Sequence, residues 1–427
     1  MICISVTFSF ILRQRYYYYY YHKGIQMKFK RTLIAASLMA ACTVANAAPS
    51  NEELYSMIQQ LKAENAALKN QVDASDEAVE AVVVQAEKMA TFSGVADKVS
   101  IGGYGELHYN NLDDQNGTAD SDKIDFHRFV LFFGYEFSDD LRFFSELELE
   151  HSLSGDGKPG EVELEQAYIQ YDMNGHNTVT GGLFLMPVGI LNETHEPDTF
   201  YGTERNPVEK NIIPTTWWEA GLMFSGDLAE GLRYDVAMTS GLDVSKKDTK
   251  STFKIRDGRQ KVASAQANDL AYTGRLKWTA IPGVELAATM QYQENITQGN
   301  VAGTEEATLF ETHAVIQQGD FGLRALYATW DLEGDTPKLT GYDEQTGWYV
   351  EPSYRISKHL GVFARYSEWD NQAGMSSIKS EMEQIDLGVN WWPHKNVVVK
   401  VDYQIQDNEK ATGKELDGMN IGVGYSF

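Results

Sequence analysis

The residues best placed to act on a solute lie in one Pro-rich, aromatic segment, 187–216. Its charged side chains are Glu193, Glu196, Asp198, Glu204, Arg205, Glu209 and Lys210. A connection of about thirty residues without strand or helix signals is uncommon unless it has a function. Carboxylates and cations gathered on such a segment can select ions and polar solutes by charge. We therefore expect these seven residues to form the constriction of a channel.

Catalysis finds little support in the sequence. It carries no G-x-S-x-G, H-E-x-x-H or Walker motif, and its cysteines are Cys3 and Cys42. His195-Glu196 could suggest a metal ligand, but a lone histidine near acids is more often polar lining. We predict no catalytic residue, no metal site and no cofactor.

The elements that must hold this segment have a β pattern from about 98 to 427. Apolar and polar residues alternate along these stretches, most clearly in 399–406, which is typical of half-buried strands. One stretch changes phase between Leu164 and Ala167. Sixteen strands are predicted, near 98–110, 123–137, 141–153, 161–173, 176–186, 217–227, 231–241, 268–280, 283–295, 306–318, 321–333, 343–357, 360–371, 380–393, 396–408 and 415–427.

Short turns alternate with longer loops between these strands, which is the arrangement of transmembrane barrels. The fold class is therefore all-β, a 16-stranded antiparallel transmembrane β-barrel over 97–427. The last strand ends on an aromatic residue. We expect Tyr425 and Phe427 to close the barrel against the strand near 101–105.

Charged residues at the inward positions of the strands would face water in the lumen, because charges facing lipid are costly. The predicted pore-lining residues are Arg128, Arg142, Glu146, Glu148, Arg233, Arg275, Arg324, Arg355 and Arg365. They either create a field that sorts solutes or cancel one another in ion pairs. Trp217-Trp218 and Trp391-Trp392 lie at predicted strand ends, where interfacial aromatics occur.

The loop after the seventh strand is also long and is basic. Its cations are Lys246, Lys247, Lys250, Lys254, Arg256, Arg259 and Lys261. We expect it either to collect anions outside the lumen or to contact the phosphates of lipopolysaccharide. The net charge of the whole chain is nevertheless −25, which argues against nucleic-acid binding.

The N-terminal residues contain no β pattern. We interpret 1–26 as an over-extended start and 27–47 as a signal peptide; lipoprotein processing at Cys42 is the alternative. Residues 48–96 carry apolar residues at alternating spacings of four and three, which predicts a periplasmic coiled-coil helix. A single surface helix packed on its own barrel is the alternative.

The segment from Gly181 to Gly221 resembles a known family. Its matching residues are Gly181, Pro187-Val188-Gly189, Phe200, Glu204-Arg205, Pro214 and Trp218-Glu219-Ala220-Gly221. They resemble the phosphate-selective porin O and P family, with a likeness extending from about 101 to 427. The resemblance implies a trimeric porin of the Gram-negative outer membrane, with Arg205 in the constriction. The family's arginine ladder and lysine cluster have no residue-by-residue match here, so we expect a general or differently selective porin.

We therefore expect an outer-membrane porin through which small hydrophilic solutes and ions diffuse passively, constricted by 187–216. Its expected partners are two further copies of the chain, outer-membrane lipid and lipopolysaccharide, with the N-terminal segment in the periplasm. The alternative is a barrel that tethers the envelope to the cell wall through the coiled coil.

Overall fold

The computed structural model describes residues 97–117, 120–245, 253–410 and 413–427, together with Glu52, Gln59 and Lys62. The contacts between residues divide the chain into two compact units, Met1–Thr91 and Phe92–Phe427. The start, the signal peptide and the coiled coil predicted for 1–96 thus fall almost wholly outside the described residues. Within the described part, no helix is long and apolar enough to cross a membrane.

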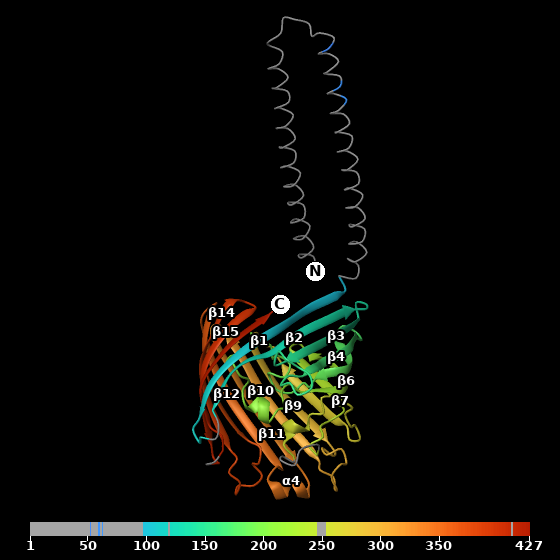
Figure 1. Ribbon diagram of the computed structural model, residues 1–427. Coiled ribbons are helices and arrows are strands. Elements are labelled where there is room, and N and C mark those ends of the chain that lie inside the picture. The colour runs from blue at the N-terminus through green and yellow to red at the C-terminus, as the bar shows by residue number, and fades with distance from the viewer. Residues whose placement is uncertain are drawn as a thin grey trace. The chain divides into compact units, whose positions relative to one another are not determined.

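Sixteen antiparallel strands form a closed barrel, as the sequence predicts (Figure 1). They are β1 (Val99–Asp114), β2 (Ser121–Glu136), β3 (Leu141–Glu150), β4 (Val162–Asp172), β5 (Asn177–Leu185), β6 (Trp218–Ala229), β7 (Leu232–Thr239), β8 (Ala271–Trp278), β9 (Val284–Gln293), β10 (Ala307–Gln318), β11 (Phe321–Leu332), β12 (Glu344–Ser357), β13 (Leu360–Asp370), β14 (Met382–His394), β15 (Val397–Asn408) and β16 (Leu416–Ser426). Short helices lie in three connections: α3 (Val208–Asn211), η1 (Ile255–Gly258) and α4 (Asp335–Thr340).

The last strand closes the barrel against the first, which confirms that prediction. Tyr425 pairs with Gly105, and the backbone of Phe427 exchanges hydrogen bonds of 2.9 and 3.1 Å with that of Gly103. The Phe427 ring lies 6.3 Å from the ring of Phe129 on β2. Pairing of β1 with β16 from Tyr104 to Asp114 joins the first and last strands and so covers the edges that an open sheet would expose.

The outer surface of the barrel is apolar because the side chains alternate between its two faces. On β14, Ile385, Leu387 and Val389 are exposed, whereas Gln384, Asp386 and Asn390 at the alternate positions are buried toward the interior. The predicted alternation of apolar outside and polar inside therefore holds on this side of the barrel.

Two β-bulges add inward-facing polar residues to the first four strands of the barrel. The register between β1 and β2 shifts so that no β1 residue pairs with His127. The register between β3 and β4 shifts in the same way at Glu165. The second shift lies where the sequence changes phase. A bulge places two residues opposite one and redirects a side chain, so Glu165 and Gln166 both reach inward-facing partners.

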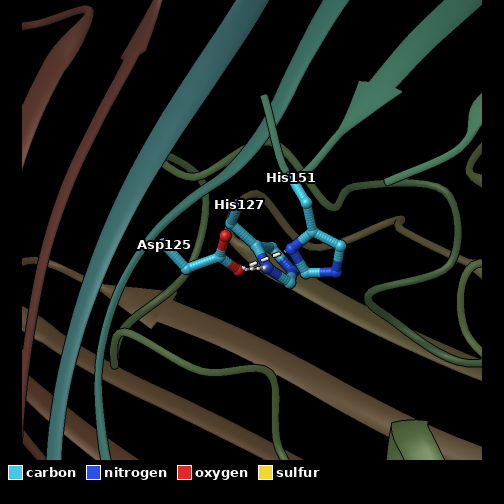
Figure 2. A group of neighbouring side chains, drawn as sticks. All are labelled: Asp125, His127 and His151. Carbon is cyan, nitrogen blue, oxygen red and sulfur yellow. Dashed lines mark hydrogen bonds and ion pairs between the residues drawn. The ribbon is translucent and has the colours of Figure 1, made fainter. Parts of the chain in front are cut away.

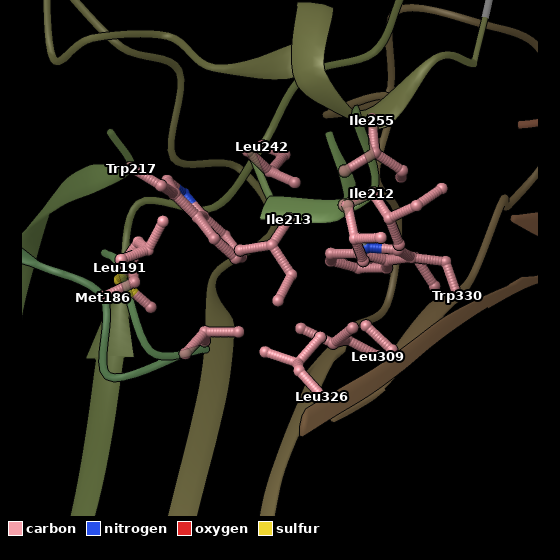
Figure 3. Close-up of a cluster of buried hydrophobic side chains, with 14 of the residues drawn as sticks. Met186, Leu191, Ile212, Ile213, Trp217, Leu242, Ile255, Leu309, Leu326 and Trp330 are labelled. Atoms are coloured by element: carbon pink, nitrogen blue, oxygen red, sulfur yellow. Dashed lines mark hydrogen bonds between the residues drawn. The ribbon is translucent and has the colours of Figure 1, made fainter. Parts of the chain in front are cut away.

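An apolar core occupies part of the interior, which the sequence analysis did not predict (Figure 3). Inward residues Leu309, Leu326 and Trp330 of β10 and β11 pack with Ile212 and Ile213 of the segment 187–216. The expectation of an all-polar lumen wall is therefore wrong for this side of the barrel.

The expectation of interfacial tryptophans is also largely wrong. Trp217 is 0% exposed in the apolar core, and Trp218 and Trp392 are buried too. Only Trp391 of the four faces outward, with 50% of its surface exposed. Trp391 and Trp392 are adjacent in β14 and so point to opposite faces, whereas Trp217 precedes β6 and packs in the core.

Candidate functional site

The segment 187–216 folds inside the barrel and is held by the carboxylate of Glu209. This group accepts hydrogen bonds from the backbone N–H of Ile190 (3.0 Å) and Leu191 (2.5 Å) and from the hydroxyl of Tyr349 (2.9 Å). Burial raises the pKa of Glu209, and the bonds from Leu191, Tyr349 and Asn206 offset part of that rise. Glu209 is 0% exposed, so the prediction that it faces a permeating ion is wrong. Its position makes it a structural hub of the segment.

Other acids of the segment contact the barrel wall at separate points. Glu193 forms an ion pair with Arg275 on β8. Asp198 accepts a hydrogen bond of 2.7 Å from Ser426 Oγ at the end of β16. The segment therefore spans the interior from β8 to β16, and these two acids help to fix it there.

Glu204 and Arg205 lie side by side but have different partners. Glu204 accepts a hydrogen bond of 3.0 Å from Asn110 Nδ2 and lies 3.1 Å from His108 Nδ1. Burial would raise the pKa of Glu204, but the hydrogen bond and charge of His108 outweigh it and hold this pKa well below its usual range. Arg205 donates to the hydroxyl of Thr216 at 2.9 Å.

A cavity of about 260 Å³ lies between this segment and the wall formed by β1–β4. The carboxylates that line it from the strands are Glu106, Glu148, Glu150, Glu163 and Glu165. The cations that line it from the two long loops are Arg205, Lys210, Arg256, Arg259 and Lys261. Among the described lining residues, Arg128 and the histidines His108, His127 and His151 on the wall, and Glu204 on the loop side, depart from this division. The cavity therefore has an acidic wall facing a basic loop surface.

Three of the cations bind neutral oxygens. Arg205 donates to Thr216 Oγ1, Arg259 to the Thr216 carbonyl at 2.6 Å, and Arg256 to the Lys210 carbonyl at 2.8 Å. Burial and the neighbouring charges of Arg259 and Arg205 lower the pKa of Arg256 to about 10. A guanidinium group stays charged at neutral pH, and the mutual repulsion of these three favours an anion beside them.

The described part of the basic loop lies inside the barrel, not on its outer surface. Phe253 and Ile255 are fully buried in the apolar core, and Arg256 and Arg259 reach the cavity. Lys261 pairs with Glu161 at 2.8 Å. Arg256 and Arg259 are therefore placed to act on solutes in the cavity. Contact of the loop with lipopolysaccharide stays a prediction, and Lys246, Lys247 and Lys250 fall outside the described residues.

A second cavity, of about 570 Å³, adjoins β3–β8. Its charged lining includes Glu146, Glu193, Glu196, His195, Arg233, Asp235, Arg275 and Lys277. Glu165 lines the first cavity, whereas Glu146 and His195 line the second. These three residues lie together, so they mark the boundary between the two cavities.

The predicted pore-lining arginines point inward, and several carry an ion pair. Arg128 bonds Glu106 at 2.5 Å, Arg142 bonds Asp172 at 2.7 Å, and Arg365 bonds Glu351 at 3.1 Å. The remaining contacts are Arg233 with Asp235 (3.7 Å), Arg275 with Asp235 (2.7 Å), Arg324 with the Thr199 carbonyl (2.7 Å) and Arg355 over the Trp392 ring (3.6 Å). Their roles in permeation stay predictions.

Two groups of possible metal ligands were missed by the sequence analysis. Asp125 Oδ2 lies 3.3 Å from His127 Nδ1 and 2.8 Å from His151 Nδ1 (Figure 2). His195, interpreted from the sequence as plain lining, meets Glu146 and Glu165. Both groups use a bulged residue, His127 or Glu165, and the phase change near Leu164 was the available signal for the second.

The sequence of the barrel matches the model of one protein family, phosphate-selective porin O and P, over residues 99–427. The chain belongs to this family. This porin is also similar to an uncharacterised protein of Aquifex aeolicus (strain VF5), with 32% identity over 349 residues, 74% of this chain and 78% of the relative.

Solved structures share the fold of this porin. An anion-selective porin from Comamonas acidovorans has a TM-score of 0.56 and 12% identity, covering 77% of this chain and 99% of that one. The trimer form of OmpT, an outer membrane protein of Vibrio cholerae, has a TM-score of 0.50 and 11% identity, covering 77% and 99%. Family and fold are those of an outer-membrane channel for solute diffusion rather than of an enzyme.

Proposed function

We propose that the porin passes small hydrophilic solutes and ions through a lumen constricted by the segment 187–216. The observation that carries this proposal is the cavity whose acidic wall faces a basic loop surface. Fixed charges of opposite sign across a narrow aqueous path orient polar solutes and select ions by their position in the field. Glu204 and Arg205 of the predicted constriction line this cavity, as does Lys210.

The charge pattern favours a general porin over one that is strictly selective for phosphate. In the described part of the chain, the bonds of Arg205, Arg256 and Arg259 go to neutral oxygens. These arginines attract anions, but the opposite wall is acidic and repels them. Net selectivity is therefore a difference between two opposed surfaces. Removing one cation should shift it measurably.

The test is the current through purified, refolded porin in a planar lipid bilayer. Stepwise conductance is expected, and a folded protein that opens no channels would contradict the proposal. Arg205→Ala should then shift the ratio of anion to cation permeability toward cations by about five-fold, because a unit charge roughly 8 Å away in water changes the energies of an anion and of a cation by about 0.5 kcal/mol each, in opposite directions. Reversal potentials across a salt gradient measure this ratio.

Lys358→Ala is the matched control, since Lys358 is exposed in the turn between β12 and β13 and lines neither of the two cavities. Its permeability ratio should stay at the wild-type value. An Arg205→Ala channel with that same ratio would place the selecting charges elsewhere.

We further propose a homotrimer whose 48–96 segments form a coiled coil in the periplasm, after removal of a signal peptide at 27–47. The trimer form of a protein with the same fold supports the assembly, and the heptad spacing supports the coiled coil. Chemical cross-linking of the porin with and without 48–96 tests both. Trimers should dominate for the whole porin and weaken without that segment.

A further inference from the structure

The boundary between the two cavities contains a buried histidine that faces two carboxylates. His195 Nε2 lies 3.4 Å from Glu146 Oε1 and 3.6 Å from Glu165 Oε2. All three side chains are at least nine-tenths buried. His195 comes from the constriction segment, Glu146 from β3 and Glu165 from the bulge in β4. Chain segments far apart in the sequence thus direct three metal-ligand atoms at one point.

The tautomer of His195 is fixed by its other ring nitrogen. Nδ1 lies 3.0 Å from the Asn192 carbonyl oxygen, which can only accept a hydrogen bond, so Nδ1 carries the proton. In the neutral ring the lone pair of Nε2 then faces the two glutamates. This arrangement is the one that orients imidazole as a metal ligand.

The spacing of these atoms suits a metal ion better than a proton. A charge-assisted N–H···O bond has a length of about 2.7 to 2.9 Å, shorter than either contact of Nε2. Ligand atoms at about 2.1 Å from a tetrahedral Zn²⁺ lie roughly 3.4 Å from one another. In the described part of the chain, His195 Nε2 and Glu165 Oε2 are buried without a hydrogen-bond partner.

Neighbouring residues hold the side chains of this site in place. Gln166 Nε2 donates to the second oxygen of Glu146 at 2.7 Å, and the Tyr104 hydroxyl lies 3.4 Å from the first. The nearest guanidinium, that of Arg128, is occupied by Glu106 at 2.5 Å and by the His195 carbonyl at 2.7 Å. Hydrogen bonds to ligating groups hold them in place and raise metal affinity.

We infer that His195, Glu146 and Glu165 bind a divalent transition-metal ion, with Zn²⁺ the best match to one imidazole and two carboxylates. The ion reaches the site from either cavity, since Glu165 lines one and the other two ligands line the second. Once bound, it joins the constriction segment to β3 and β4. The inference goes beyond the proposed diffusion function and does not depend on it.

The binding test is calorimetric titration of Zn²⁺ into chelator-treated, folded porin, with zinc content measured after dialysis. Wild type should hold one tightly bound ion per chain, and His195→Ala should bind it at least about ten-fold more weakly. His176→Ala is the matched control, because His176 is exposed in the turn before β5. Equal affinity of His195→Ala and wild type, or no binding by wild type, would overturn the inference.

A further variant separates this site from the second histidine group. His151→Ala removes a ligand from the Asp125–His127–His151 group (Figure 2) and should leave the tight ion bound. Loss of the ion in His151→Ala, with retention in His195→Ala, would place the metal at that group and refute the assignment.

Anomalous diffraction at the zinc edge from wild-type crystals needs no variant and covers the case in which His195→Ala does not fold. The peak should lie between His195 Nε2, Glu146 and Glu165; a peak elsewhere or none contradicts the site. In bilayers, Zn²⁺ should lower the conductance of wild type and a chelator should restore it. Because binding is measured without current, failure of the metal site and failure of the channel function are distinguishable.

Discussion

The two sides of the lumen make different contacts with the constriction segment, residues 187–216. Toward β10–β13, the wall presents Leu309, Leu326 and Trp330, which pack against Ile212 and Ile213 (Figure 3). Toward β1–β4, the wall presents carboxylates that face loop arginines across a cavity. One side holds the segment, and the other leaves charged groups beside water.

This difference has a physical reason. Burial of apolar surface contributes about 25 cal/mol per Å² and needs no exact geometry, whereas a solvated ion pair contributes roughly 0 to 1 kcal/mol. A charged surface alone would therefore hold a long segment poorly. Packing on the apolar side allows the opposite side to keep charges that are available to solutes.

The largest expected effect comes from removing the centre of the apolar side. Trp330 is buried, and its indole N–H donates to the Ile212 carbonyl at 3.1 Å. Trp330→Ala should lower the free energy of unfolding by about 3 to 5 kcal/mol and make the single-channel current noisier, because the segment loses its anchor. Denaturant unfolding in lipid vesicles and bilayer recordings measure the two effects.

Trp391→Ala removes the same side chain from the outer face, where half of its surface is exposed. Its current noise should match that of wild type. If the Trp330→Ala current is as quiet as wild type, the apolar side does not hold the segment.

A somewhat smaller loss is expected from Glu209→Ala. The substitution leaves the N–H groups of Ile190 and Leu191 and the Tyr349 hydroxyl without their acceptor. Each unsatisfied group costs about 1 to 3 kcal/mol, and relaxation of the loop should hold the total to roughly 2 to 4 kcal/mol in the same unfolding assay. Glu230→Ala, in an exposed turn, is the control; equal midpoints for the two variants would refute the structural role.

The charged side should respond in selectivity instead of stability. Substituting both Arg256 and Arg259 by Ala should shift the permeability ratio toward cations by about thirty-fold, since two charges change the energies of an anion and of a cation by roughly 1 kcal/mol each, in opposite directions. Reversal potentials at low salt measure the shift. A large drop in unfolding free energy with unchanged selectivity would mean that these arginines hold the loop.

The smallest effect should come from the acidic wall and should have the opposite sign. Glu150→Gln removes one negative charge from the same cavity and should shift the permeability ratio toward anions by about five-fold. Recording at 1 M salt, where the screening length is about 3 Å, should abolish most of both shifts. A shift toward cations would contradict the division of charge across the cavity.

The strands were predictable because their signal is local. Alternation along 380–393 is dictated by lipid on one face and the lumen on the other, and β14 follows it. Even the irregularity between Leu164 and Ala167 was visible, and it proved to be a bulge. The pairing of Phe427 with Gly103 followed from the count of strands.

The interior was predictable only in part because its contacts join distant segments. Glu204 and Glu209 are both glutamates of the constriction segment, and the sequence does not distinguish them. Glu209 is nevertheless buried among hydrogen-bond donors, whereas Glu204 lines the cavity. Trp217 gave the signal of an interfacial residue and is instead part of the core.

The sequence by itself determined the closed barrel, its strand order and the segment that enters it, since these depend on short-range alternation and on chain closure. Only the tertiary structure decided which loop residues pack, which face the cavity, and that His195 meets Glu146 and Glu165. These contacts depend on how a loop packs against strands that are distant in the sequence, and a local sequence pattern does not predict such packing.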